Sequence, residues 1–252
     1  LEELIARDRR HGGIPFMVVA TAGTTNAGLV EPLHEIGAVA RRDRLHFHVD
    51  AAWGGGVILS DKYRSELNGI ETADTITFDP HKLLSVPMGA GMFLVREKSW
   101  LYDAFGLQTD YVPQSPTDNF DNYQISFQFS RRFIGLKLFM TLAALGREGL
   151  ARTIDGQFDL AKMLAGKLED AGFQVVNGAS LGVVCFVPPA EWQFKTHGQF
   201  EELVERVCQT GRAWISTTKF GGRSVFRACI TSHLTRICDL DELVSLVSSA
   251  KR

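Results

Sequence analysis

Lys82 has neighbours that suit covalent amine chemistry. It closes the segment Asp-Pro-His-Lys at residues 79–82, after a predicted strand, and Leu83 and Leu84 follow it. A lysine taken alone is usually a solvated surface residue. Here we expect apolar surroundings to favour the uncharged amine, which is the form that attacks a carbonyl group. Lys82 is therefore a candidate for Schiff-base chemistry.

Asp50 is a candidate partner for a bound heterocycle. It ends a predicted strand in the segment His-Val-Asp-Ala-Ala-Trp-Gly-Gly, residues 48–55. The small residues after it leave a flat surface on which a planar ring could lie. A carboxylate facing a pyridine nitrogen favours its protonated form, by about 4 kcal/mol at an effective dielectric of about 20 before desolvation is subtracted. The protonated ring then accepts electrons from a carbanion.

The same strand allows a different interpretation. His46, His48 and Asp50 alternate along it, so their side chains would lie on one face as possible metal ligands. Histidines on a buried strand also serve as hydrogen-bonded core groups. A metal site would leave Lys82 without a role, and we therefore predict no metal.

These residues need a sheet to bring them together. Short apolar runs predict strands at residues 16–20, 45–50, 75–78 and 92–95, and helical spacing predicts helices at 1–10 and 31–42. A third motif, Thr-Ala-Gly-Thr-Thr at residues 21–25, follows the first strand. Alternating strands and crossovers predict an α/β sheet, in which ligands gather at the carboxyl ends of the strands.

The rest of the chain predicts a second, smaller unit. A polar segment at residues 106–122 precedes two expected helices, at 127–145 and 149–171. Strands are then expected at 173–176, 182–187, 214–217 and 224–230, with helices at 200–209 and 239–250. We predict two domains, residues 1–145 and residues 146–252, of which the second is a small α+β unit.

The composition favours a globular protein that acts on a small molecule. Hydrophobic residues make up 45% of the 252 residues, and the net charge is -2 with no basic run, so we expect no nucleic-acid partner. No apolar stretch reaches the roughly 18 residues of a membrane span. Four scattered cysteines fit buried thiols in a reducing compartment, so we predict a cytoplasmic location.

The three motifs together resemble the group II decarboxylases that depend on pyridoxal 5'-phosphate (PLP). This family includes glutamate, cysteine sulfinate and aromatic amino-acid decarboxylases. The specific signal is the pairing of residues 48–55 with Asp-Pro-His-Lys-Leu-Leu at 79–84, and the similarity runs over nearly the whole chain. It implies a fold-type-I PLP-dependent transferase-like large domain, with part of a mostly parallel sheet in residues 1–145, and a small C-terminal domain.

The resemblance also implies a role for each motif residue. Lys82 would form the internal aldimine with the cofactor, and Asp50 would pair with the pyridinium nitrogen. Ala52 would pack beneath the ring, and His81 would touch the phosphate. Thr24 would lie near the phenolic oxygen of the cofactor and the substrate carboxylate.

Two further residues match the family's pattern. Tyr111, in the polar segment, matches a loop tyrosine that protonates the quinonoid carbon after carbon dioxide leaves, often in the active site of the opposite subunit. A loop tyrosine taken alone is more often a surface anchor. Arg227 matches an arginine that holds the substrate carboxylate, for which a bidentate guanidinium is suited. The alternative for Arg227 is that it satisfies backbone carbonyls.

The expected activity is decarboxylation of an L-amino acid to its amine. Oxidative deamination or a lyase reaction on the same fold, and a non-catalytic role beside a second polypeptide, remain alternatives. Residues 130–133 resemble the aromatic decarboxylases and residues 86–90 differ from the acidic-substrate branch, which implies an aromatic or other non-acidic substrate. In this family a phosphate-binding loop and a ring-stacking residue should precede residue 1. We therefore expect a homodimer with shared active sites or a complementary amino-terminal fragment or chain.

Overall fold

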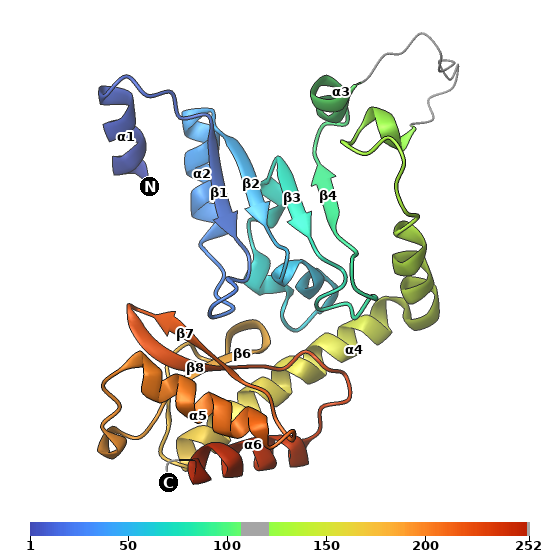
Figure 1. Ribbon diagram of the computed structural model, residues 1–252. Helices are drawn as coiled ribbons and strands as arrows, with labels where there is room; N and C mark the ends of the chain where they lie inside the picture. The colour runs from blue at the N-terminus through green and yellow to red at the C-terminus, as the bar shows by residue number, and fades with distance from the viewer. Residues whose placement is uncertain (107–120, 251–252) are drawn as a thin grey trace.

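The computed structural model describes residues 1–106 and 121–250. They form two units, each built on a four-stranded sheet, which helix α4 joins (Figure 1). The first sheet has the order β1-β2-β3-β4, and the second has the order β5-β6-β8-β7. The strands of the first sheet are β1 (Met17–Thr21), β2 (His46–Asp50), β3 (Thr75–Phe78) and β4 (Met92–Val95).

The first sheet is mostly parallel. β1, β2 and β3 run in the same direction and β4 runs antiparallel to β3. The register places Thr21 beside Asp50, and Asp50 beside Thr77. The carboxyl ends of the three parallel strands therefore lie at one edge of the sheet, where α/β proteins hold their ligands.

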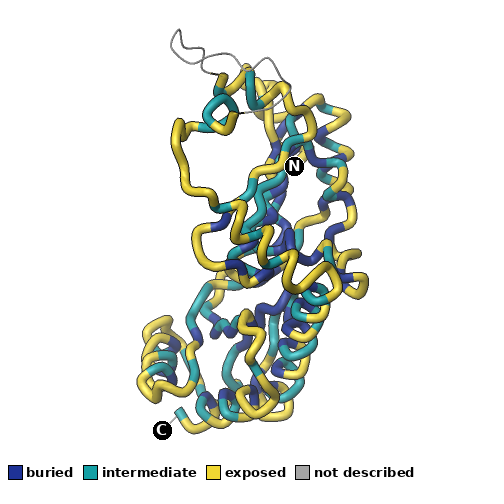
Figure 2. The backbone as a smooth tube through the Cα atoms, turned by 90° about the vertical axis from the view of Figure 1, so that its right-hand side faces the viewer, coloured by how far each residue is buried: buried dark blue, intermediate teal, exposed yellow. Residues whose placement is uncertain are grey.

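One face of this sheet is packed and the other is open. Ala20, Phe47 and Val49 are almost completely buried and belong to the hydrophobic core. Val19 and Phe93, on the opposite face, are about half exposed. Figure 2 shows buried and exposed backbone in both the upper and the lower part of the molecule. The apolar run at residues 16–20 is typical of a strand covered on both faces. Among the described residues, its burial instead alternates from one residue to the next.

Short helices complete the first unit. Helix α2 (Leu33–Asp43) packs against β1 and β2. Helix α1 (Glu2–Arg10) precedes β1, and α3 (Ser99–Phe105) follows β4. Four 3-10 helices also occur, at Gly54–Leu59, Arg64–Leu67, Ile70–Thr72 and Asn122–Gln124.

Helix α4 (Gly135–Asp170) consists of two helices joined at a kink, which agrees with the two helices expected from the sequence. Its backbone leaves helical geometry at Gly146, which has φ 63° and ψ 175°. The prediction that helix begins at residue 127 is wrong, because Phe127 and Phe129 pack against the rings of Phe105 and Tyr123 in irregular backbone. No helix in the described residues, α4 included, is long and apolar enough to cross a membrane.

The two hydrophobic cores meet along α4. Its residues Leu150, Ile154 and Phe158 pack into the core of the first unit. Further along the helix, Ala161 and Leu164 pack into the core of the second unit. One helix therefore anchors both units, while the domain boundary between residues 145 and 146 stays a prediction.

The second unit is an antiparallel sheet with two helices. Its strands are β5 (Gln174–Val175), β6 (Val183–Val187), β7 (Ser216–Phe220) and β8 (Arg223–Cys229). Its helices are α5 (His197–Gln209) and α6 (Ile237–Ser249), with 3-10 helices at Ser180–Gly182 and Ala190–Trp192. Helix α5 begins with a capping box between Thr196 and Gln199, which satisfies amides at its first turn. The expected α+β unit is therefore present.

Candidate active site

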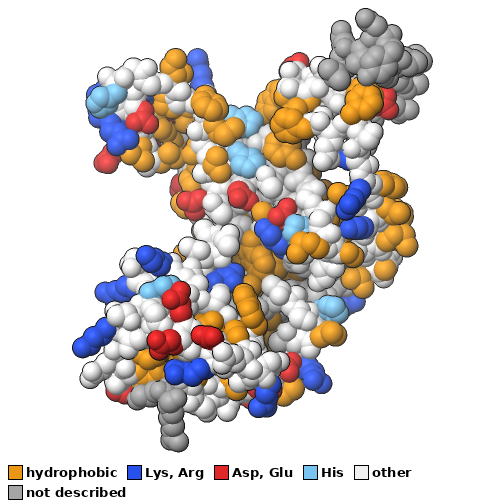
Figure 3. All heavy atoms as spheres, viewed as in Figure 1, with side chains coloured by type: hydrophobic (Ala, Val, Ile, Leu, Met, Phe, Trp, Pro, Cys, Tyr) orange, Lys and Arg blue, Asp and Glu red, His pale blue; other side chains and the backbone are white. Residues whose placement is uncertain are grey.

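The three motifs meet at the carboxyl edge of the first sheet. Thr21 ends β1 and Asp50 ends β2, and the segment 79–82 follows β3 directly. Figure 3 shows acidic, basic and histidine side chains close together in this central part of the molecule, above the smaller unit. The sheet topology thus brings together residues that lie far apart in the sequence.

Asp50 is fixed by the turn that follows it. Its Oδ1 atom accepts a hydrogen bond from the amide of Ala52 at 3.0 Å. The turn then packs against the end of β1, where the amide of Gly54 donates to the carbonyl of Ala22 at 2.9 Å. A Cβ atom on Gly54 would lie 2.3 Å from that carbonyl oxygen, so only glycine permits the contact. The small residues after Asp50 therefore allow this turn to pack closely against the end of β1.

Lys82 is paired with an acid. Its Nζ atom lies 3.0 Å from Oδ2 of Asp79, and the side chains of Lys82 and Asp79 are 34% and 21% exposed. The surroundings of the amine are therefore not the apolar ones expected from Leu83 and Leu84. Those two leucines are buried in the core instead, and the Lys82 amide closes a turn with the Asp79 carbonyl at 3.0 Å.

Lys82 and Asp50 belong to segments that end at the same edge of the sheet. Asp50 is the last residue of β2 and the register partner of Thr77 in β3. The segment 79–82 follows β3 directly, and its Asp79 pairs with the Lys82 amine.

His81 is oriented by the segment that leads into β4. Its Nδ1 atom lies 2.7 Å from the carbonyl oxygen of Ala90, so Nδ1 carries the proton and donates it. The backbone between them turns through Ser85, which has a positive φ of 53°. The Nε2 atom of His81 is consequently the nitrogen left for a ligand.

Thr24 belongs to a compact loop after β1. Its amide donates to the carbonyl of Leu29 at 2.9 Å, and its Oγ1 atom accepts from the Leu29 amide at 3.1 Å. A threonine hydroxyl that accepts a hydrogen bond still has its own proton to donate. Thr24 can therefore offer a donor at the edge of the sheet.

Arg227 comes from the smaller unit. It lies on β8, and its Nε atom donates to the carbonyl of Thr25 at 3.1 Å. The structure thus brings Arg227 to the loop of Thr24, as a substrate clamp would need. The same bond also satisfies a backbone carbonyl, so both interpretations of Arg227 stay open. Tyr111 lies outside the described residues.

The two histidines of β2 both contact one threonine. His46 Nε2 and His48 Nδ1 lie 2.8 Å and 2.9 Å from Oγ1 of Thr75. Burial, opposed by the charge of Asp50, lowers the pKa of His48 from its usual value. Within the residues described here, no cluster of three or more His, Cys, Asp or Glu side chains is suited to a metal ion.

Sequence reasoning missed Asp79 and Thr75. Asp79 lies three residues before Lys82 in a turn, and two side chains at that spacing can meet. The sequence alone therefore could have predicted the pairing of this acid with the lysine. Thr75 is the register partner of His48, and its role depends on strand pairing that no local pattern gives.

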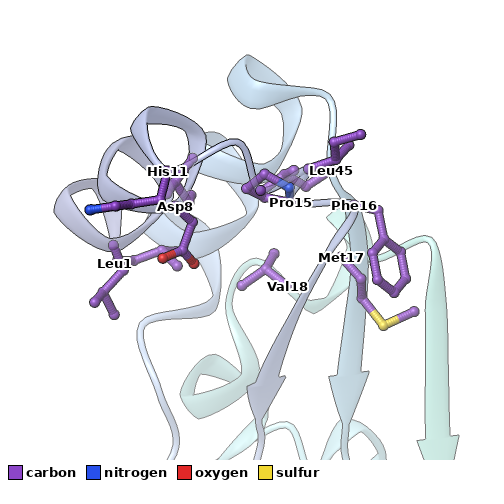
Figure 4. Close-up of a pocket in the computed structure, with 12 residues that line it drawn as sticks. Leu1, Asp8, His11, Pro15, Phe16, Met17, Val18 and Leu45 are labelled. Atoms are coloured by element: carbon purple, nitrogen blue, oxygen red, sulfur yellow. The ribbon is translucent and has the colours of Figure 1, made fainter.

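A pocket of about 490 Å³ lies elsewhere, between α1 and the start of β1 (Figure 4). Leu4, His11 and Phe16 are among its lining residues, and none of the candidate site residues is. It opens at the amino end of β1, whereas ligands of α/β sheets bind at the carboxyl ends. It therefore does not compete with the site described above.

The chain is similar to known decarboxylases. Residues 1–188 match the pyridoxal-dependent decarboxylase conserved domain. The chain is 33% identical over 240 residues to an aromatic-L-amino-acid decarboxylase of Bacillus atrophaeus, covering 91% of this chain and 49% of that protein. It is 34% identical over 262 residues to cysteine sulfinic acid decarboxylase of Mus musculus, covering 97% of this chain and 53% of that one.

Solved structures agree with these relatives. A crystal structure of mouse CSAD superposes with a TM-score of 0.90 at 32% identity, covering 100% of this chain and 55% of that chain. The structure of Oryza sativa TDC with PLP and tryptamine superposes with a TM-score of 0.91 at 28% identity, covering 99% and 53%. The fold-type-I prediction is confirmed. Although it spans about half the length of its curated relatives, the chain belongs to the group II pyridoxal-dependent amino-acid decarboxylases.

Proposed function

We propose that the chain carries the lysine of a PLP-dependent enzyme that removes the α-carboxylate of an L-amino acid and releases the amine and carbon dioxide. One observation carries the proposal most directly. Asp50 ends β2 and the segment 79–82, which contains Lys82, directly follows β3, so both lie at the edge where the parallel strands end. Membership of the family supports it as well.

The residues present fit this cofactor. The Asp50 carboxylate accepts one bond at Oδ1 from the Ala52 amide, and a carboxylate has about four acceptor positions. It therefore keeps acceptor capacity for a protonated ring nitrogen. His81 offers Nε2 toward a phosphate, and Lys82 offers the amine that holds the aldehyde. When bound, the cofactor supplies the electron sink for the pair left by the departing carboxylate.

Substrate contacts come from the loop after β1 and from the smaller unit. We infer that the Thr24 hydroxyl and the Arg227 guanidinium face the substrate carboxylate. The bond from Arg227 Nε to Thr25 supports this, since it fixes the guanidinium at the loop. Tyr111 is proposed as the proton donor for the carbon that loses carbon dioxide. The substrate is proposed to be aromatic or otherwise non-acidic.

A second reaction on the same fold has a specific observation in its favour. The chain is 30% identical over 243 residues to a phenylacetaldehyde synthase of Arabidopsis thaliana. The tyrosine at position 111 favours plain decarboxylation in our proposal, because a phenolic group there can protonate the product carbon. Aldehyde formation is therefore the outcome against which the proposal is tested.

We propose a homodimer with shared active sites, or pairing with a complementary amino-terminal chain. Several large apolar side chains before and along the first half of α4 support such contacts. The most exposed of these are Phe127, Phe133, Phe139 and Met140. Light scattering after size exclusion, with and without cofactor, measures the assembly. The cytoplasmic location stays a prediction.

The decisive experiment follows products from a panel of amino acids. The full-length protein, purified with PLP, is assayed for carbon dioxide, amine and aldehyde in parallel. We expect amine and carbon dioxide in equal amounts, and no amine from Lys82→Ala. Aldehyde and hydrogen peroxide in place of amine would refute decarboxylation as the reaction. Turnover by Lys82→Ala equal to that of the unaltered protein would refute the site.

A further inference from the structure

The loop of residues 24–29, called here the threonine loop, uses its amides and its carbonyls differently. Several of its amides bond within the loop: Gly28 donates to the carbonyl of Thr24 at 2.7 Å, and Leu29 donates to Thr24 Oγ1. The carbonyls of residues 25–28 instead accept hydrogen bonds from side chains of the smaller unit.

Each of four successive carbonyls receives one side chain from that unit. The donors reach the carbonyl oxygens of residues 25, 26, 27 and 28 at 3.1, 3.3, 2.7 and 2.9 Å, and they are, in order, Arg227 Nε, Cys185 Sγ, Asn177 Nδ2 and Ser180 Oγ. Burial raises the pKa of Cys185 to about 11, so its thiol keeps the proton that it donates. This unbroken series holds the loop at residues 25–28.

Asn177 is the central member of the series. It is 8% exposed, and its Nδ2 atom donates both to Ala27 and to the carbonyl of Val183 at 2.9 Å. Its Oδ1 atom accepts from the amides of Cys185 and Ala179 at 2.9 and 3.3 Å. All its hydrogen-bonding groups are therefore engaged, and they tie the start of β6 directly to the threonine loop.

The backbone next to Asn177 is bent to reach both motifs. Ala179 and Leu181 adopt positive φ values of 55° and 44°, a conformation that is costly for residues with a side chain. The bend aims Ser180 at Gly28, and it aims the carbonyl of Leu181 at Nε1 of Trp53, which donates to it at 3.0 Å. Trp53 lies in the turn that begins at Asp50. The same bend thus touches the loop and the turn at the candidate site.

We propose that the smaller unit sets the position of Thr24 for the substrate carboxylate, with Asn177 and Ser180 as positioning residues that act through the loop backbone. The inference rests on the proposed function, because Thr24 is the hydroxyl placed beside that carboxylate. Neither positioning residue needs to touch the substrate. Loosening the loop should therefore weaken substrate binding more than it slows the chemical step.

Ser180→Ala is the main test, with Ser224→Ala as its matched control. Ser224 belongs to the same unit and also loses one side-chain hydrogen bond, to His197 at 2.9 Å, but it does not contact the threonine loop. In the full-length PLP-loaded protein we expect Ser180→Ala to raise KM about fivefold, as the loss of one hydrogen bond does, with kcat nearly unchanged. Ser224→Ala should leave both constants unaltered.

Hydrogen exchange of the loop amides gives a readout that does not depend on activity. The amides of Thr24, Gly28 and Leu29 should exchange about fivefold faster in Ser180→Ala than in Ser224→Ala. Asn177→Asp, which removes both donated bonds, should have a larger effect on both readouts. If Asn177→Asp fails to fold, Ser180→Ala decides alone.

The outcomes separate this inference from the proposed function. An unaltered protein without turnover on any amino acid overturns the proposed function, and the positioning role with it, whatever the exchange rates. An active protein in which Ser180→Ala changes neither exchange nor KM overturns the positioning role alone. Faster exchange at an unchanged KM also overturns it, since the loop would then move without consequence for binding.

Discussion

Gly28 lies close to the backbone of the smaller unit, and replacing it should weaken the contact between the two units. It has a positive φ of 69°, and an added Cβ atom would lie 2.2 Å from the carbonyl oxygen of Ser180 and 3.2 Å from Cβ of Val183. A backbone oxygen cannot move aside as the end of a flexible side chain can. Gly28→Ala must therefore shift one unit relative to the other.

The expected loss of stability has three parts. Alanine in left-handed backbone costs about 1–2 kcal/mol. Relieving the overlap with Ser180 adds about 1–3 kcal/mol, and the lost hydrogen bond from Ser180 to the Gly28 carbonyl adds about 1 kcal/mol. We expect Gly28→Ala to lower the free energy of unfolding by about 3–6 kcal/mol, a large part of the 5–15 kcal/mol typical of a protein.

Gly211 provides a matched control, because its φ of 68° is nearly the same and no atom lies within 4 Å of an added Cβ. Gly211→Ala should lose only the backbone part, about 1–2 kcal/mol. Urea unfolding of both variants, followed by tryptophan fluorescence, measures the difference. Equal losses in the two variants would show that the approach of the two units at Gly28 is not tight, and would refute the reasoning.

Three further outcomes follow from the site. Tyr111→Phe should lower amine formation about 100-fold or more without changing the absorbance of the bound cofactor, as the loss of a general acid does; an unchanged rate would exclude that role. Asp79→Asn should raise the labelling of Lys82 by a small aldehyde and borohydride about twofold to fivefold, because a partly exposed ion pair contributes about 0.5–1 kcal/mol. Mass spectrometry measures the labelling, and equal labelling of the two proteins would contradict this expectation. Because burial raises the pKa of Cys185 to about 11, its contribution to stability is present below the usual thiol pKa of about 8.5 and is lost as the pH rises toward 11. A thiol reagent at pH 8 should therefore modify the exposed Cys238 and spare Cys185, and the reverse order would be inconsistent with that burial.

The strands were predictable because their signals are local. The sequence places strands at residues 75–78 and 92–95, and the structure has β3 and β4 at those positions. Apolar runs bounded by turn formers define such segments without any knowledge of their partners. The start of α4 was missed for the opposite reason. Phe127 is apolar at helical spacing, yet a ring contact with Phe105 holds it in irregular backbone.

The motifs were predictable as a set, while the surroundings of each residue were not. Asp50 and the segment 79–82 follow strands, so their meeting at one edge of the sheet follows from topology alone. The pairing of Lys82 with Asp79 depends on the direction in which Leu83 and Leu84 pack into the core. An apolar sequence pattern does not predict that direction. Asn177 reaches Ala27 across 150 residues of sequence, and no local pattern predicts such a bond.

The origin of each site residue implies that cofactor and substrate depend on different parts of the fold. Asp50, His81 and Lys82 are positioned within the first unit, by β2, by the segment after β3 and by bonds to Ala52, Ala90 and Asp79. Thr24 and Arg227 are positioned where the two units meet. Changes at that contact should therefore act on substrate binding while the cofactor-holding side chains keep their geometry. A bond that only stabilised the whole chain would instead affect substrate binding and cofactor binding together. Measuring the two kinds of binding separately therefore distinguishes a positioning role from a general stabilising one.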